Sequence, residues 1–142
     1  LNWGADVAKQ RKDYRQAFEF YRQAAEVSHQ CIVKKCKDEE QKKLAHTSQE
    51  GALIGEIDMA ETAKLSDLRV SAYDHYLALN PRGPREFEVR YQKAQVEFER
   101  KDYSKSASMF RSLALEKNSN VQLKTSAASM SIDALTSAKD LD

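Results

Sequence analysis

The sequence has few residues that break helices. Only four glycines and two prolines occur among its 142 residues. Alanine, glutamine, glutamate, lysine and arginine are common instead, and these residues lose little side-chain freedom in a helix. The composition therefore predicts an all-α fold. The length suits a single domain whose core is spread between neighbouring helices.

The sequence also lacks an excess of charge of one sign. Its 23 basic residues nearly balance its 22 acidic ones, which leaves a net charge of +1. Such a chain has no strong overall field to attract phosphates or an anionic membrane, so we expect neither nucleic acid nor lipid as its main partner. A basic run at Lys34-Lys35-Cys36-Lys37 and Lys42-Lys43 is interrupted by acidic residues, which is typical of a solvated helix face.

Long apolar runs are missing as well. No stretch approaches the roughly 18 apolar residues of a membrane span, so membrane insertion is not expected. The first nine residues lack the basic start and apolar stretch of a signal peptide. The sequence begins with Leu1 rather than methionine and ends at Asp142 in a segment that is predicted to be helical. We therefore expect a fragment of a longer protein.

Cysteine is scarce, with only Cys31 and Cys36 present. They are five residues apart in a segment predicted to be helical, which places them about 140° apart around the axis. The spacing therefore predicts two isolated thiols rather than a disulfide. With His29 and His46 they suggest zinc, but the segment has no Cys-x-x-Cys pair, and one helix would aim the four side chains in different directions. No metal or cofactor is expected.

Features of an enzyme active site are also absent from the sequence. It has no glycine-rich loop that could hold a phosphate. Nothing in the pattern directs His46 or His75 toward both a nucleophile and a carboxylate, as nucleophilic catalysis would need. We therefore do not expect catalysis by this segment.

What the sequence does contain is apolar residues at the three- and four-residue spacing of helix faces. The predicted helix faces contain Tyr14, Ala17, Phe18, Tyr21, Ala24 and Ala25; Val70, Tyr73, Tyr76 and Leu77; Phe87, Tyr91, Ala94 and Phe98; Tyr103, Ala107, Phe110, Leu113 and Ala114; and Leu123, Ala127, Met130 and Ala134. The far side of the last helix is rich in serine and threonine. Loops are predicted at residues 80–84, 100–102 and 118–120.

The segment from Val27 to Lys64 leaves two arrangements open. It has no proline, and Gly51 and Gly55 are the only possible breakers, so one long helix and two shorter helices both fit. Its charged part is expected to be solvated, and packing is predicted to resume at Leu53, Ile57 and Ala60. Ser66 and Asp67 are predicted caps of the next helix, which Asn80-Pro81 should end.

One tetrapeptide occurs twice, as Arg11-Lys12-Asp13-Tyr14 and as Arg100-Lys101-Asp102-Tyr103. Each copy lies between two predicted helices. A small residue follows three positions after the tyrosine, at Ala17 and Ser106, and an aromatic residue four positions after that, at Tyr21 and Phe110. This pattern resembles the tetratricopeptide repeat, a helical hairpin with an alanine where its two helices touch. The segment 72–81 also resembles the second helix and closing proline of such a repeat, in the version found in bacterial cell-envelope proteins.

The resemblance implies a right-handed stack of about seven antiparallel helices in a single domain, residues 1–142. Its parts are expected to be a first hairpin at 1–26, an enlarged middle unit at 27–81, the best-matching repeat at 85–118 and the start of a further unit at 121–142. Tyr14 and Tyr103 are 89 residues apart, which is no multiple of the usual repeat of about 34 residues. The excess is expected in the charged part of the middle unit.

The resemblance also implies a function. In this family a partner peptide lies in a groove lined by the first helix of each hairpin, which here predicts contacts from Tyr91, Gln95, Phe98, Ile54, Asp58 and Glu61. An alternative is that Tyr91 and Phe98 are ordinary core residues, because a groove face and a packing face have the same spacing.

The expected function is a scaffold or adaptor for a protein or peptide. The alternatives are a non-catalytic helical domain of a larger enzyme and a structural spacer that self-associates through its repeat ends. The likeness to envelope proteins favours a bacterial periplasm.

Overall fold

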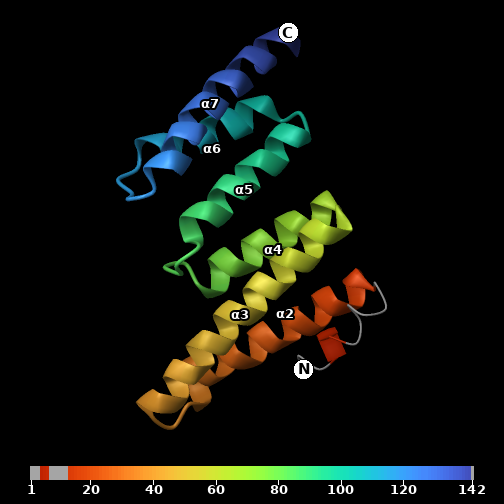
Figure 1. Ribbon diagram of the computed structural model, residues 1–142, viewed down its shortest axis with the longest axis vertical. Helices are drawn as coiled ribbons and strands as arrows, with labels where there is room; N and C mark the ends of the chain where they lie inside the picture. Colours follow the sequence, from red (N-terminus) through yellow and green to blue (C-terminus); the bar gives the residue numbers. More distant parts are fainter. Residues whose placement is uncertain (1–3, 7–12, 142) are drawn as a thin grey trace. The chain divides into compact units, whose positions relative to one another are not determined.

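The computed structural model describes residues 4–6 and 13–141, apart from the side chains of Lys35 and Leu141 (Figure 1). All regular structure in this part of the chain is helical, which confirms the all-α prediction. The chain divides into two compact units, the N-terminal unit Leu1–Gly83 and the C-terminal unit Pro84–Asp142. The first helix of the hairpin expected at 1–26 falls mostly outside the described residues, although residues 4–6 are helical. The right-handed superhelix remains a prediction.

From residue 13 on, the N-terminal unit contains three α-helices and one π-helical turn. They are α2 (Tyr14–Gln30), the π-helical η1 (Cys31–Lys35), α3 (Glu39–Ala63) and α4 (Ser66–Leu79). Helix α3 packs against both α2 and α4, and Figure 1 shows α2 and α3 side by side. The segment from Val27 to Lys64 is therefore not one helix: it contains the end of α2, then η1, and then the separate helix α3, and the chain reverses direction between η1 and α3.

The predicted apolar faces form the core of this unit. Buried side chains from α2 are Ala17, Phe18 and Ala25, and those from α3 include Ala52, Leu53, Ile57 and Ala60. Both Gly51 and Gly55 lie inside α3 and do not break it. At Gly55 a Cβ atom would lie only 2.6 Å from the ring of Tyr21, so the missing side chain allows α2 to approach α3 closely.

Helix α4 begins and ends near the predicted residues, but the predicted caps are wrong. Ser66 is the first helical residue, Leu65 occupies the N-cap, and no side chain caps the helix. Asp67 lies in the first turn, where a negative charge suits the helix dipole. The helix ends at Leu79 before Asn80-Pro81, as predicted, because proline disfavours helical geometry in the preceding residue.

The prediction of two isolated thiols is also wrong, since Cys31 and Cys36 form a disulfide. The prediction assumed that an α-helix continued through both residues. Instead, residues 31–35 form a π-helical turn, in which the N–H group of Cys36 donates to the carbonyl of Cys31, five residues earlier, over 2.8 Å. The wider turn brings the two Cα atoms to 4.8 Å, within the usual range for a disulfide.

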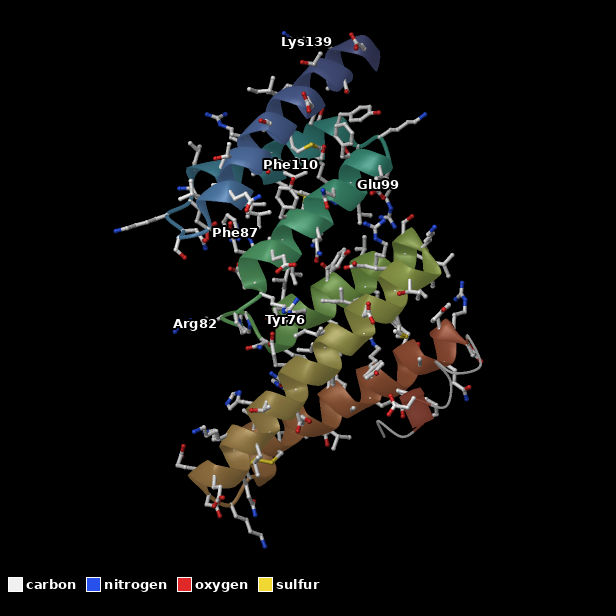
Figure 2. The ribbon with its side chains drawn as sticks, viewed as in Figure 1. Tyr76, Arg82, Phe87, Glu99, Phe110 and Lys139 are labelled. Carbon is white, nitrogen blue, oxygen red and sulfur yellow. A yellow bond between two sulfur atoms is a disulfide. The ribbon has the colours of Figure 1, made fainter. Side chains whose placement is uncertain are left out.

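The C-terminal unit has three helices, α5 (Glu86–Glu99), α6 (Tyr103–Leu115) and α7 (Val121–Leu141), separated by the predicted loops. Helix α6 packs against both α5 and α7. Figure 2 shows Phe110 among these helices, and its side chain is fully buried. The predicted faces supply the core, which consists of Phe87, Ala94, Phe110, Leu113 and Ala127, with Tyr91, Phe98, Met109, Ala114, Leu123 and Met130 packed against it.

The two copies of the tetrapeptide begin α2 and α6 in the same way. The Oδ1 atom of Asp13 accepts a hydrogen bond from the N–H group of Gln16 over 3.1 Å, and that of Asp102 accepts one from Lys105 over 3.4 Å. Such contacts satisfy amides that have no partner in the first turn. Ala17 and Ser106, the small residues after each copy, are both completely buried. In the part of each copy that the structure describes, the N-cap contact and the buried small residue are therefore the same.

Candidate functional site

Of the three residues predicted on α5, Tyr91 and Phe98 pack against the core of the C-terminal unit. Tyr91, Gln95 and Phe98 are each half-buried. The ring of Tyr91 meets Phe110 edge-on, with centroids 5.3 Å apart, and the ring of Phe98 meets Tyr103 at 5.1 Å. Both aromatic residues therefore contribute to packing, as the alternative interpretation anticipated, and both keep some accessible surface. Contact with a partner stays a prediction for all three.

The other predicted residues lie on α3, in the N-terminal unit. Asp58 is exposed, while Ile54 and Glu61 are half-buried. Glu61 accepts a hydrogen bond from the hydroxyl of Tyr73 over 3.1 Å, which joins α3 to α4. Asp58 is thus the most accessible of the three, and Glu61 has a structural contact besides any role in binding.

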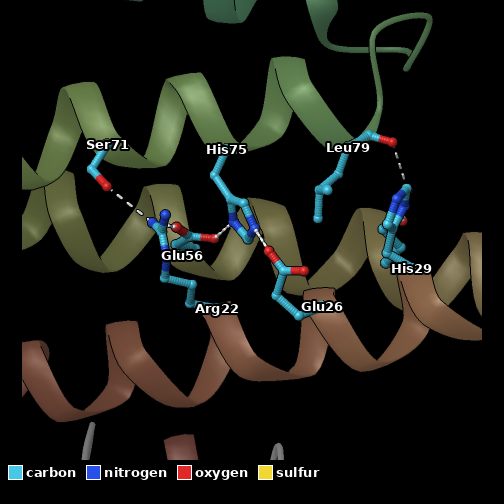
Figure 3. A network of polar contacts seen from close by, with 8 residues as sticks. Arg22, Glu26, His29, Glu56, Ser71, His75 and Leu79 are labelled. Atoms are coloured by element: carbon cyan, nitrogen blue, oxygen red, sulfur yellow. Dashed lines mark hydrogen bonds and ion pairs between the residues drawn. The ribbon is translucent and has the colours of Figure 1, made fainter.

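A partly buried network of charged side chains, which the sequence did not predict, joins α2, α3 and α4 (Figure 3). Arg22 on α2 donates to Oε1 of Glu56 on α3 over 2.8 Å and to the hydroxyl of Ser71 on α4 over 2.9 Å. On α4, Nδ1 of His75 lies 2.6 Å from Oε2 of Glu56, and Nε2 lies 2.6 Å from Oε1 of Glu26 on α2. The network contains two basic and two acidic side chains.

The environment of the network raises the pKa values of two of its residues, His75 and Glu56. Burial alone would lower the pKa of His75, but the hydrogen bonds and charges of Glu56 and Glu26 outweigh it, so the pKa is raised. Burial raises the pKa of Glu56, and the nearby His75 and Arg22 only partly oppose this effect. An imidazole whose two nitrogens both face carboxylate oxygens is best satisfied as the imidazolium, which can donate twice.

This arrangement suits a structural role better than catalysis. Both ring nitrogens of His75 are engaged, so the imidazole has no lone pair with which to activate a nucleophile. The hydroxyl of Ser71 accepts a hydrogen bond from Arg22 over 2.9 Å. No local sequence pattern indicates these pairings, because His75 lies 19 residues from Glu56 and 49 from Glu26.

An open groove lies beside the network in the same unit. It has a volume of about 490 Å³ and is lined by Arg22, Asp67, Val70, Ser71, Asp74, His75 and Ala78. Arg22 and His75 form part of both the groove and the network. The groove thus exposes one edge of the charged cluster without reaching Glu56, which is fully buried.

Helix α7 carries an apolar stripe on the face that points away from its core contacts. Val121, Ile132 and Leu135 are 69, 64 and 53 % exposed, whereas Ala127 and Ala134 on the opposite face are completely buried. We call Val121, Ile132 and Leu135 the outer stripe. Helix α7 packs on α6 and has a few contacts with α5, while α3 in the other unit is covered by both α2 and α4.

The described residues contain neither a metal-binding cluster nor a membrane span. Among them, no cluster of three or more His, Cys, Asp and Glu side chains is arranged to hold a metal ion. The disulfide also leaves neither Cys31 nor Cys36 as a thiolate ligand. Within the described residues, no helix is both long enough and apolar enough to cross a bilayer.

Comparison of the chain with protein-family models, with curated proteins and with solved structures gave no match.

Proposed function

We propose that this chain is a protein-interaction module, a divergent segment of tetratricopeptide type that holds a partner protein through exposed helix faces. The observation that carries the proposal is the outer stripe of α7. Large apolar side chains cost free energy when they face water, and rows of them on an otherwise polar surface commonly mark contact sites. Their spacing along one helix fits a partner that presents an apolar face of its own.

The repeated turn supports the type of module. Asp13 and Asp102 cap α2 and α6 by the same contact, and the small residues Ala17 and Ser106 are buried after each cap. Helical repeats bury their apolar faces against neighbouring helices. The partner that best fits the outer stripe is therefore an amphipathic helix, packed on α7 as α4 packs on α3.

The disulfide supports an oxidising location, such as the bacterial periplasm favoured by the sequence resemblance. Disulfides persist in secreted and periplasmic proteins and are uncommon in the reducing cytosol. Cys31 and Cys36 are both half-buried, so a reductant in the cytosol would have access to them.

The test is a quantitative affinity capture from cells that make the protein, with the full chain as bait. The stripe variant Ile132→Glu, Leu135→Glu is compared with the control Gln122→Glu, Ser129→Glu, which adds the same charge at exposed positions beside the stripe. We expect one protein to be held by the parent and the control and lost by the stripe variant. If all three baits hold the same proteins equally, the outer stripe is not the binding face.

Two further baits test the faces predicted from sequence. Gln95→Ala and Asp58→Ala each remove a side chain that makes little or no contribution to the core. Tyr91 and Phe98 are unsuitable for this purpose, because their rings pack against Phe110 and Tyr103 and their loss would disturb the fold. Selective loss of the partner from either bait would place that face in the interface.

A further inference from the structure

The reversal of chain direction between α2 and α3 uses no residue type that is specialised for turns. Residues 31–38 contain neither glycine nor proline, and η1 still follows a helical path as far as Lys35. Only the next few residues leave that path, with Cys36 at φ −67°, ψ 124° and Asp38 at φ −145°, ψ 172°. By contrast, Lys64 and Lys101, at the ends of α3 and α5, adopt positive φ angles of 58° and 66°. The sequence of this joint is therefore compatible with a helix that continues straight from α2 into α3.

The polar contacts that hold the reversal have equivalents in a straight helix. Asp38 accepts from the N–H group of Gln41 over 2.8 Å, and the side chain of Gln41 accepts from the N–H group of Lys37 over 3.1 Å. In a continuous helix these amides would instead bond to carbonyls four residues earlier. The Asp38 cap would then be dispensable, because the amide of Gln41 would have a carbonyl partner.

The disulfide has no such equivalent. Residues five apart in an α-helix point about 140° away from each other. Cys31 and Cys36 therefore cannot remain bonded if the joint straightens. The disulfide and a continuous helix exclude each other, so the oxidation state of these two cysteines selects between the two forms of the joint.

The remaining contacts of α2 could be made by a second copy of the chain. Helix α2 is held to α3 by the buried Ala17, Phe18 and Ala25, by Arg22 with Glu56, and by the ring of His29, whose Nδ1 lies 3.1 Å from Oε1 of Gln49. If two copies straightened their joints, the α2 of each could pack on the α3 and α4 of the other with the same contacts, including those of Arg22 with Ser71 and of Glu26 with His75. Such reciprocal exchange is a known route to dimers when a hinge permits it.

We propose that the Cys31–Cys36 disulfide locks the reversal between α2 and α3, and that its reduction allows two copies of this chain to exchange α2 through a continuous α2–α3 helix. The co-reactant is a small dithiol. It donates two electrons and two protons, the S–S bond breaks to give two cysteine thiols, and the dithiol closes to its own disulfide. This inference is independent of the proposed function.

A proline at position 39 should distinguish the reversed joint from the continuous α2–α3 helix. Glu39 is the first residue of α3, where proline is favoured because its missing N–H group needs no helical partner there. Asp38, which precedes it, already has the extended geometry that a following proline requires. Glu39→Pro is therefore compatible with the reversal, whereas in a continuous helix the same proline would lie in the interior and break it.

The experiment measures molar mass by light scattering, for the full chain at several concentrations with and without dithiothreitol. We expect reduction to double the mass of the parent, the Cys31→Ser, Cys36→Ser variant to be doubled without reductant, and Glu39→Pro to keep the mass of the oxidised chain when reduced. Circular dichroism checks that Glu39→Pro retains its helices.

Two results would overturn the inference. One is an unchanged mass for the reduced parent and the double serine variant at every concentration. The other is an equal doubling for reduced Glu39→Pro, because a chain that cannot straighten its joint cannot exchange α2 in this way. The stripe variant Ile132→Glu, Leu135→Glu should still double on reduction, which separates exchange of α2 from association through α7.

Discussion

The Nδ1 atom of His75 lies 2.6 Å from Oε2 of Glu56, which joins α4 to α3 inside the N-terminal unit. The pKa values of both residues are raised, so the folded chain holds these protons more tightly than the unfolded chain does. The stability that His75 contributes is fully present below its unfolded pKa of about 6.5 and is lost as the pH rises through its raised folded pKa. The raised pKa of Glu56 gives a change of the same sign, beginning above its own unfolded value near 4.5.

We therefore predict that the melting temperature falls between pH 6 and pH 9. In His75→Gln this fall should be shallower, because one of the two titrating groups has gone. The substitution should also lower the free energy of unfolding at pH 6 by about 3 kcal/mol, since it removes one partner of a buried charge pair. Thermal unfolding followed by circular dichroism across the pH range measures both effects.

The matched control is His46→Gln, the same substitution at an exposed position of α3. It should leave the melting temperature and its pH dependence close to those of the parent. An identical pH profile for His75→Gln and the parent would contradict a role for the network in the pH response.

The two glycines of α3 should respond to alanine in opposite directions. At Gly51 an added Cβ meets no atom within 4 Å, so Gly51→Ala should stabilise the chain by about 0.5–1 kcal/mol through its better helix propensity. At Gly55 the added Cβ would lie 2.6 Å from the ring of Tyr21, and Gly55→Ala should destabilise it by about 1–3 kcal/mol. Chemical denaturation of both variants gives the comparison. Equal stabilisation would mean that α2 is farther from α3 than described.

Phe110 should be the most sensitive position tested in the C-terminal unit. Its side chain is fully buried in the core cluster, and Phe110→Ala should cost about 3–5 kcal/mol. Leu115→Ala, two residues after Leu113 on the same helix, removes a side chain that is 75 % exposed and should cost less than about 0.5 kcal/mol. Denaturant unfolding that showed similar losses for both would place the wrong face of α6 in the core.

The joint between α5 and α6 offers a stabilising change. Lys101 has a φ angle of 66°, which is unfavourable for a residue with a side chain and easy for glycine. Lys101→Gly should raise the free energy of unfolding by about 0.5–1 kcal/mol. Arg111→Gly, inside α6 at an exposed position, should instead lower it by about 1 kcal/mol. A loss of stability in both variants would contradict the left-handed geometry at Lys101.

Several features of the fold followed from local patterns. Apolar spacing placed the helix faces that contain Phe18, Leu53 and Phe110, all of which are buried. Asn80-Pro81 and the Arg100-Lys101-Asp102 turn marked helix ends correctly. Such features depend on neighbours within one or two helical turns, so the sequence alone contains the information.

Other features depend on contacts between distant residues, or on a local departure from ideal geometry. The sequence analysis did not predict the disulfide, because it assumed α-helical geometry at both Cys31 and Cys36. The chain instead forms a wider π-helical turn there. The charged network was missed because the partners of His75 belong to two other helices. The serine- and threonine-rich side of α7 was expected, but the exposure of Ile132 and Leu135 there depends on which helices pack against α7.

The disulfide closes the six residues from Cys31 to Cys36 into a covalent ring. One residue of this ring, Lys34, has an exposed side chain. A protease that cuts after lysine can open the peptide bond that follows Lys34 without releasing either fragment, because the two sulfurs still join them. The nicked chain would gain the mass of one water molecule and would run as a single species until a reductant is added. Mass spectrometry of a brief tryptic digest, before and after reduction, thus reads out the covalent state of this ring directly.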